Sequence, residues 1–146
     1  MPPPPDLPEL LLQRSFPGMS EPESRILRAW LAQHGAEYDR IEFNVRVGEG
    51  QELPPDTPDF VKELARSVSR PRIDVVASVS DVVRLIEVKV RAGLSSIGQL
   101  VGYRTLYFAD HPGTARIELH IVAARTSPDV LRVLSENGIG IELVNA

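Results

Sequence analysis

Five segments of the chain have the hydrophobic patterns of β-strands. In the first, Ile41, Phe43, Val45 and Val47 alternate with polar residues, which predicts a half-buried strand with these side chains on one face. The other segments are short runs rich in Val and Ile, bounded by turn residues. The five segments are residues 38–48, 71–79, 81–90, 115–124 and 139–145.

Helical spacing of apolar residues predicts four helices, one before the first strand and three between strands. The first begins after Ser20, with Glu23 three residues later in a capping-box spacing, and it ends at Gly35. The other three are expected over residues 58–68, 95–111 and 127–138, with Ser95 or Ser96 and then Ser127 as N-caps, and Gly138 as the last stop.

Strands that alternate with helices predict an α/β domain. We expect a mixed central sheet with an antiparallel hairpin in its middle and helices flanking it. This single domain is expected over residues 20–146, after a proline-rich arm, residues 1–19, that is extended through its first eight residues. A loop and the short helix, residues 48–69, form an insertion between the first two strands.

Composition narrows the functional classes. The chain has no cysteine, which excludes disulfides and thiolate metal sites. It shows no signal-peptide pattern and no apolar run near the length of a membrane span, so we expect a cytoplasmic protein without a membrane partner. The net charge of −4 does not indicate nucleic-acid binding. Residues 70–125 nevertheless carry eight basic and five acidic side chains, a local excess that could bind a polyanion or simply be solvated.

A tight turn at residues 80–81 determines how the second and third strands pair. It pairs Val79 with Val82, and the same register places Asp74 directly opposite Glu87 on one face of the sheet. Lys89 follows two residues after Glu87 and lies on this face too. It is one of only two lysines in a chain with fourteen arginines.

Two carboxylates that face each other across a hairpin repel, so the pair needs a compensating charge. Mg²⁺ is the natural candidate, because proteins usually hold it with one or two carboxylates, together with waters and substrate phosphates. Lys89 could then contact a phosphate or help to deprotonate a water. The alternative is an ion pair between Lys89 and a carboxylate on a solvated face, without a metal.

The order of these residues resembles the PD-(D/E)XK nuclease superfamily. In that pattern an Asp precedes a hairpin whose second strand carries Glu-x-Lys, and many RecB-like members add Gln-x-x-x-Tyr on the next helix. The matching segments are IDVV, LIEVK and QLVGY, with Asp74, Glu87, Lys89, Gln99 and Tyr103 at the motif positions. The last helix and strand resemble the end of NucS-type nucleases. The resemblance covers residues 20–146, and it departs from the pattern at Ile73, where Pro would stand.

The resemblance implies a restriction-endonuclease-like core, α-β-β-β-α-β with a further α-β, and metal-dependent phosphodiester hydrolysis. Asp74, Glu87 and the backbone carbonyl of Val88 would bind Mg²⁺, for which Mn²⁺ would substitute. Lys89 would position or activate the attacking water. Glu23 is a candidate third carboxylate, and its alternative role is the capping box of the first helix.

Five further residues are candidates for contact with the substrate. Gln99 and Tyr103 lie one helical turn apart, and the resemblance implies that they border the site; a polar helix edge is the alternative. Arg72, Arg91 and Arg104 flank the hairpin and could bind phosphates, although each could equally be a solvated arginine. The three histidines show no ligand spacing and are expected to be structural: His34, His111 and His120.

The sequence therefore favours a metal-dependent nuclease that acts on DNA. The alternative is a catalytically idle nuclease-like fold that serves as a nucleic-acid-binding or assembly module. Because so small a domain has little surface with which to grip DNA, we expect a homodimer or a subunit of a larger complex. The proline-rich arm and residues 48–69 are the candidate contact regions.

Overall fold

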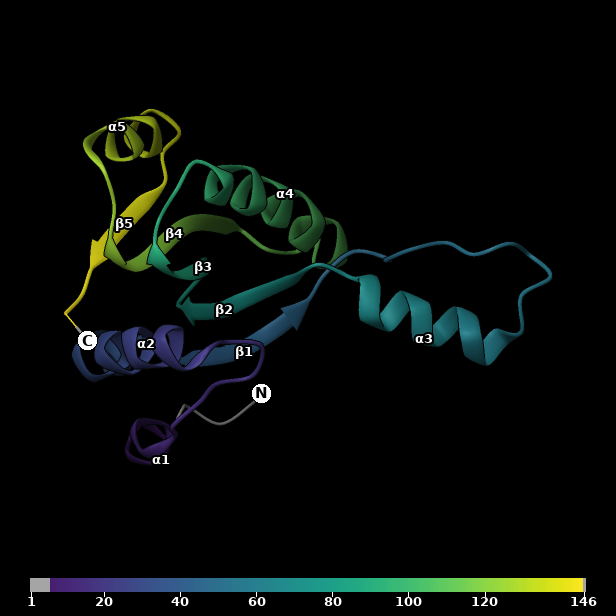
Figure 1. Ribbon diagram of the computed structural model, residues 1–146, viewed down its shortest axis with the longest axis horizontal. Coiled ribbons are helices and arrows are strands. Elements are labelled where there is room, and N and C mark those ends of the chain that lie inside the picture. Colours follow the sequence, from purple (N-terminus) through teal and green to yellow (C-terminus); the bar gives the residue numbers. More distant parts are fainter. Residues whose placement is uncertain (1–5, 146) are drawn as a thin grey trace.

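The computed structural model of the protein describes residues 6–145, apart from the side chain of Ser67. Its centre is a five-stranded sheet in the order β1-β2-β3-β4-β5 (Figure 1). β1, β2 and β3 pair antiparallel, whereas β3, β4 and β5 pair parallel, which confirms the predicted mixed sheet. The strands are β1 (Arg40–Arg46), β2 (Arg72–Val79), β3 (Val82–Arg91), β4 (Arg116–Arg125) and β5 (Gly140–Leu143).

Helices cover both faces of this sheet. One face carries α2, and the other carries α4 and α5 (Figure 1). α1 packs beside α2, and α3 projects away from the sheet, as Figure 1 shows. No helix within residues 6–145 is long and apolar enough to cross a membrane. The helices are α1 (Leu7–Leu12), α2 (Glu21–His34), the short 3-10 helix η1 (Gly35–Glu37), α3 (Asp59–Ser69), α4 (Ser95–Asp110) and α5 (Pro128–Glu136).

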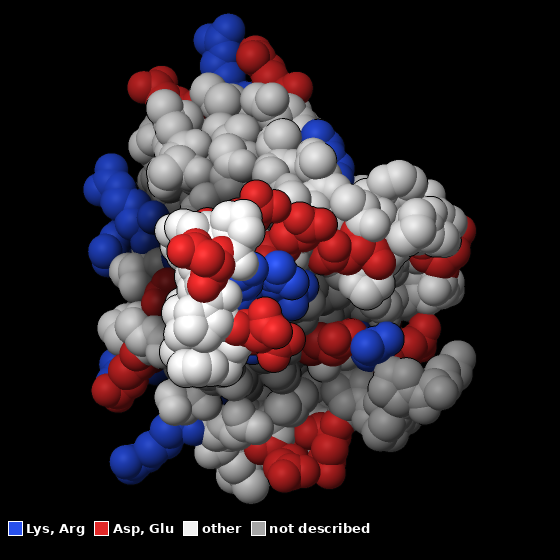
Figure 2. Space-filling view, turned by 90° about the vertical axis from the view of Figure 1, so that its right-hand side faces the viewer, with Lys and Arg blue, Asp and Glu red and all other residues white. Residues whose placement is uncertain are grey.

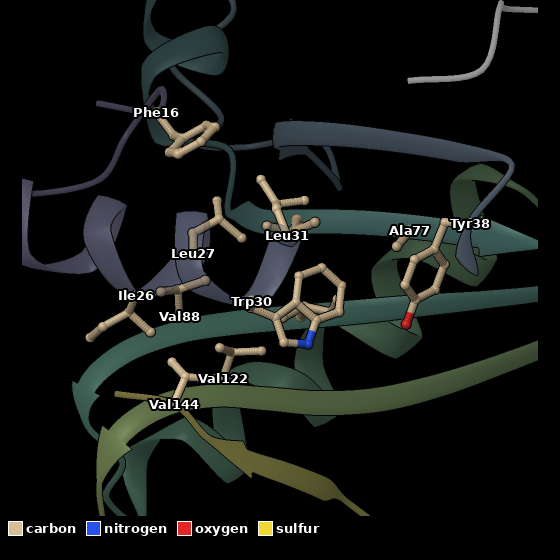
Figure 3. Close-up of a cluster of buried hydrophobic side chains, with 12 residues drawn as sticks. Phe16, Ile26, Leu27, Trp30, Leu31, Tyr38, Ala77, Val88, Val122 and Val144 are labelled. Atoms are coloured by element: carbon tan, nitrogen blue, oxygen red, sulfur yellow. The ribbon is translucent and has the colours of Figure 1, made fainter. Parts of the chain in front are cut away.

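Each face of the sheet has its own hydrophobic core. Under α2, Leu27 and Trp30 pack with Val88 and other strand residues (Figure 3). On the opposite face, Leu100 of α4 and Leu134 of α5 complete the second core. The central strands are thus buried on both sides. This explains why β2 and β4 contain consecutive apolar residues, at 75–77 and 121–124, rather than a strict alternation.

β1 does not keep its hydrophobic side chains on one face, so that prediction was wrong. Ile41 and Phe43 pack toward the core under α2, whereas Val45 and Val47 belong to the core under α4 and α5. The change of face occurs at Asn44, whose φ of 53° lies in the left-handed region that regular strands exclude. A bend therefore interrupts β1 at Asn44.

The N-terminal arm is helical rather than extended over the part that the structure describes. Residues 1–5 lie outside the described residues, but α1 begins at Leu7, and Pro8 occupies its first turn, where a missing N–H is tolerated. Arg28 of α2 donates to two backbone carbonyls just after α1. The prediction of an extended start was therefore wrong at residues 7 and 8, and this segment is bound to its own domain.

The predicted helix caps are present on α2 and α5. Ser20 and Glu23 form the capping box of α2, and the Ser127 hydroxyl accepts a hydrogen bond in the first turn of α5. α4 differs, because its N-cap is Leu94 and no side chain caps it. The prediction of a serine cap at residue 95 or 96 was wrong.

Candidate active site

The β2–β3 hairpin has the register that the sequence predicted. The pairing runs from the turn at Ser80 to a last pair formed by Val75 and Ile86. In this register the next two residues are Asp74 and Glu87. The two carboxylates therefore lie where regular pairing between the strands ends.

Asp74 takes the place of the next backbone hydrogen bond. The N–H of Val88 donates to Oδ2 of Asp74 at 2.9 Å. The N–H and C=O of one strand residue point toward the same neighbouring strand, so the Val88 carbonyl faces the same gap. The carboxylate of Asp74 therefore borders this gap on the β2 side. The carbonyl of Val88 and the carboxylate of Glu87 border it on the β3 side.

The electrostatics of this gap are set by burial. Glu87 is only 2% exposed, and burial followed by the negative charge of Asp74 raises its pKa to about 7. Burial also raises the pKa of Asp74, although the Val88 N–H opposes that shift. Two neighbouring carboxyls thus resist being ionised together near neutral pH. A bound divalent cation would remove this conflict, because it favours the ionised form of both groups.

Lys89 lies at the border between the carboxyls and solvent. Its Nζ is 3.4 Å from Oε2 of Glu87, and 30% of its side chain is exposed. Its charge lowers the pKa of both carboxyls, but burial outweighs this effect. The ion pair considered as the alternative to a metal is therefore present, yet it includes a buried glutamate and does not lie on a solvated face.

Glu23 combines the capping-box role with an electrostatic effect on Asp74. Its Oε1 accepts from the N–H of Ser20 at 2.9 Å, and its charge contributes to the raised pKa of Asp74. Among residues 6–145, no three His, Asp or Glu side chains are arranged so as to hold a metal ion. The structure thus does not bring Glu23 to Asp74 and Glu87 as a third metal ligand.

The two candidate residues on α4 have different surroundings. Tyr103 packs against the core under α4, and burial, together with the charges of Glu87 and Asp74, raises the pKa of its hydroxyl. Gln99 is exposed. The structure therefore brings Tyr103 to the carboxyl pair and leaves Gln99 on the outer surface of the helix.

The three candidate arginines are divided between two places. Arg72 is half-buried at the start of β2, and Arg91 is exposed at the end of β3. Both lie at the end of the hairpin that carries the carboxyls. Arg104 instead lines a pocket of about 490 Å³ together with Arg84 and Arg116, beside the first half of β4.

The three histidines, which the sequence predicted to be structural, each contact other parts of the protein. His34 of α2 makes ion-pair contacts with Glu37 and with Glu142 of β5. His111 stacks on the ring of Tyr107. His120 is half-buried, and burial lowers its pKa to about 4.

Two features that shape the site were not predicted from the sequence. One is the bend of β1 at Asn44, which lies between the β1 residues that pair with Ile73 and Val75 on either side of Asp74. The other is the Val88 N–H as a donor to Asp74. An Asn within an alternating strand is a signal for the first, because Asn tolerates the left-handed conformation. The Val88 N–H as a donor has no such signal, because this N–H is available to Asp74 only where the backbone pairing of β2 and β3 ends.

Comparison with known proteins gives little further information. No family model matches the chain, and no curated protein matches it. Among solved structures, the chain is similar to the crystal structure of AF1548, a protein of unknown function, with a TM-score of 0.43 and 13% sequence identity. The similarity covers 82% of this chain and 56% of AF1548, so the chain spans about half the length of that protein.

Proposed function

We propose that this protein is a metal-dependent nuclease with a restriction-endonuclease-like core that hydrolyses phosphodiester bonds, with DNA as the favoured substrate. The observation that supports this proposal is the neighbouring pair of the half-buried Asp74 and the buried Glu87, with Lys89 3.4 Å from Glu87. Like charges in opposed strand positions destabilise a fold. A role in holding a cation would account for the presence of two carboxyls at these positions.

The donor atoms around the gap suit a hard divalent cation. Asp74, Glu87 and the carbonyl of Val88 would hold one Mg²⁺, and Mn²⁺ would substitute for it. Such cations prefer oxygen ligands, and Mg²⁺ needs only one or two carboxylates when waters and phosphate complete its shell. A cation bound there would lower the pKa of a water and offset the charge of the phosphate.

The remaining side chains would act on the water and the phosphate. The ammonium of Lys89 would orient the attacking water and offset charge that develops on the phosphate. The hydroxyl of Tyr103, whose pKa is raised further above neutral, is protonated and would donate a hydrogen bond to the substrate. Arg72 and Arg91 would bind phosphates on either side of the cleaved bond.

A cleavage assay tests the proposal. Labelled single-stranded DNA, duplex DNA and RNA are incubated with the full chain in Mg²⁺, in Mn²⁺ and in a chelator. We expect cleavage of DNA only with a divalent cation. Glu87→Gln should lower the rate by at least about 100-fold, since it removes one carboxylate with almost no change in shape. Glu136→Gln, at an exposed position of α5, is the matched control and should cleave normally.

Two outcomes would count against a nuclease. Full activity of Glu87→Gln would remove the carboxyl pair from the reaction. DNA binding without cleavage in either metal would instead support an idle nuclease-like fold that binds nucleic acid. The cytoplasmic location expected from the sequence stays a prediction.

A further inference from the structure

α3 turns its most hydrophobic side toward solvent. Phe60, Leu64 and Val68 recur at every fourth residue, and they are 77%, 63% and 63% exposed. We call these three residues the α3 stripe. Figure 1 shows that α3 stands away from the sheet. A surface helix usually turns such a stripe toward the core of its own domain, so an outward stripe indicates a contact with another molecule.

The loop that precedes α3 contacts the helix at other positions. The Lys62 ammonium donates to the carbonyl of Pro55 at 2.9 Å. The hydroxyl of Ser69 accepts from the N–H of Gln51 at the far end of the helix. Gly50 packs so closely on the last turn that a Cβ there would lie 2.5 Å from the carbonyl oxygen of Arg66. The loop thus fixes which side of α3 faces outward.

The surroundings of the α3 stripe are acidic. Residues 48–69 carry five acidic and two basic side chains, and Figure 2 shows acidic side chains gathered around a few basic ones on this side of the molecule. Helical spacing places Glu63, three residues after Phe60, along the edge of the stripe, and Asp59 lies one turn before Glu63. An acidic border disfavours nucleic acid and anionic membranes, and it favours an apolar surface with basic neighbours.

The outer side of α4 offers such a surface. It carries a row of small, exposed residues, namely Gly98, Gly102, Thr105 and Ala109. A Cβ added at Gly98 or Gly102 would meet nothing within 4 Å. Each glycine inside a helix costs about 1 kcal/mol relative to alanine. No contact within the described residues requires either one, so close approach of another molecule is a reason for both.

One flank of this row adds apolar and basic side chains. Phe108 is 49% exposed, and Arg104 lies one helical turn before it, where α4 borders the pocket beside the first half of β4, and is exposed as well. Arg104 has no ion-pair partner among residues 6–145. α4 therefore presents small residues, an apolar ring and a positive charge, which complement the large side chains and acidic edge of α3.

We propose that the α3 stripe binds a second copy of this chain, on the outer side of that copy's α4. Large side chains on one helix fill the space left by small residues on the other, as in ordinary helix packing. Across a two-fold axis the exchange is reciprocal, so each copy contributes one α3 and receives one. Specific interfaces bury roughly 1,200–2,000 Å² in total, and two such contacts double the area that a single stripe can supply.

Sedimentation equilibrium of the full chain tests this proposal. We expect a monomer–dimer equilibrium with a dissociation constant on the order of 10 µM, which weakens as salt screens the charges. Replacing Phe60 and Leu64 together with Ser should raise the dissociation constant at least about tenfold. The melting temperature should not fall, because both side chains are already exposed. Leu131→Ser, at a 40% exposed leucine of α5, is the matched control and should dimerise like the wild type.

A second variant tests the α4 side. Gly102→Leu fills the proposed groove and should weaken the dimer at least about tenfold. It should not lower the melting temperature, because leucine favours helix more than glycine does. Glu63→Arg and Arg104→Glu should each weaken the dimer, and combining them in one chain should restore part of the affinity.

Four outcomes would overturn the proposal. The first is a chain that stays monomeric at every concentration. The second is a dimer that survives the Phe60 and Leu64 replacements. The third is a dimer that is lost with those replacements but is unaffected by Gly102→Leu, since α3 would then bind elsewhere. DNA binding that requires the α3 stripe in a monomer would assign the stripe to nucleic acid instead.

Discussion

At Glu87, burial and the charge of Asp74 raise the pKa from 4.5 to about 7. A carboxyl whose pKa is raised in the folded state binds its proton more tightly there than in the unfolded chain. Its contribution to stability is therefore complete below about pH 4.5 and is lost as the pH rises through about 7.

Glu87→Gln should change how stability depends on pH. Without divalent cations, the wild type should lose on the order of 1–3 kcal/mol of unfolding free energy relative to the variant between about pH 4.5 and pH 8. His120 acts in the opposite sense, because its lowered pKa of about 4 makes stability fall as the medium is acidified below 6.5. That contribution is common to both proteins and cancels in the difference.

Urea denaturation of both proteins at about pH 5 and about pH 8 measures this effect. If the difference in unfolding free energy between wild type and Glu87→Gln is the same at both pH values, the raised pKa of Glu87 is contradicted.

Lys89 should contribute more to the rate of cleavage than to the binding of DNA. Lys89→Met keeps the length of the side chain but removes the ammonium, and it should lower the single-turnover cleavage rate by about 100-fold or more. Lys89→Arg should restore little, since a planar guanidinium does not replace a compact ammonium beside Glu87. DNA binding, measured separately in Ca²⁺, should change much less. An Arg variant with the wild-type rate would contradict the role proposed for Lys89.

The grouping of the site residues could be predicted from the sequence, but their environment could not. A two-residue turn and the period of two in a strand suffice to place Asp74 opposite Glu87. The burial of Glu87 depends on α4 and on Tyr103, which come from another part of the chain. The place of Arg104 depends on the direction in which α4 crosses the sheet.

At the scale of the elements, β1 is the strand that departs from its pattern. Its apolar residues alternate regularly along the sequence, but the left-handed φ of Asn44 moves Val45 and Val47 to the opposite face. Alternation alone cannot reveal a bend, because it assumes that every residue has extended backbone angles.

Substitutions at Asn44 test this bend. Asn44→Gly should keep or slightly increase stability, because glycine adopts a positive φ without strain. Asn44→Val should cost on the order of 1–3 kcal/mol of unfolding free energy, since a β-branched residue is strained there. Ser78→Val, at a regular position of β2, is the control and should be close to neutral. Urea denaturation measures all three, and a well-tolerated Asn44→Val would contradict a bend at this position.

The helices show which local signals are reliable. The capping box of α2 and the serine cap of α5 involve residues close in sequence, so they could be predicted. α1 could not be predicted, because its short apolar run is stabilised by contact with α2 as well as by its own cap. The outward orientation of the α3 stripe could not be predicted either, since helical spacing shows that a stripe exists but not whether it faces the core or solvent.

At the scale of the whole molecule, the order of strands and helices predicted the mixed sheet with a central antiparallel hairpin. This succeeded because a short turn joins β2 and β3, whereas helices join β3 to β4 and β4 to β5. The sheet brings Asp74 and Glu87 together at the end of the hairpin. Our proposal is that this pair holds a divalent cation.

Calorimetric titration of Mn²⁺ into the metal-free protein at neutral pH tests this claim most directly. The comparison is between the wild type and Asp74→Asn, which removes one carboxylate charge and keeps the shape of the side chain. We expect binding at one site in the wild type and an affinity at least about tenfold weaker in the variant. Equal Mn²⁺ affinity in the two proteins, or no binding to either, would contradict it.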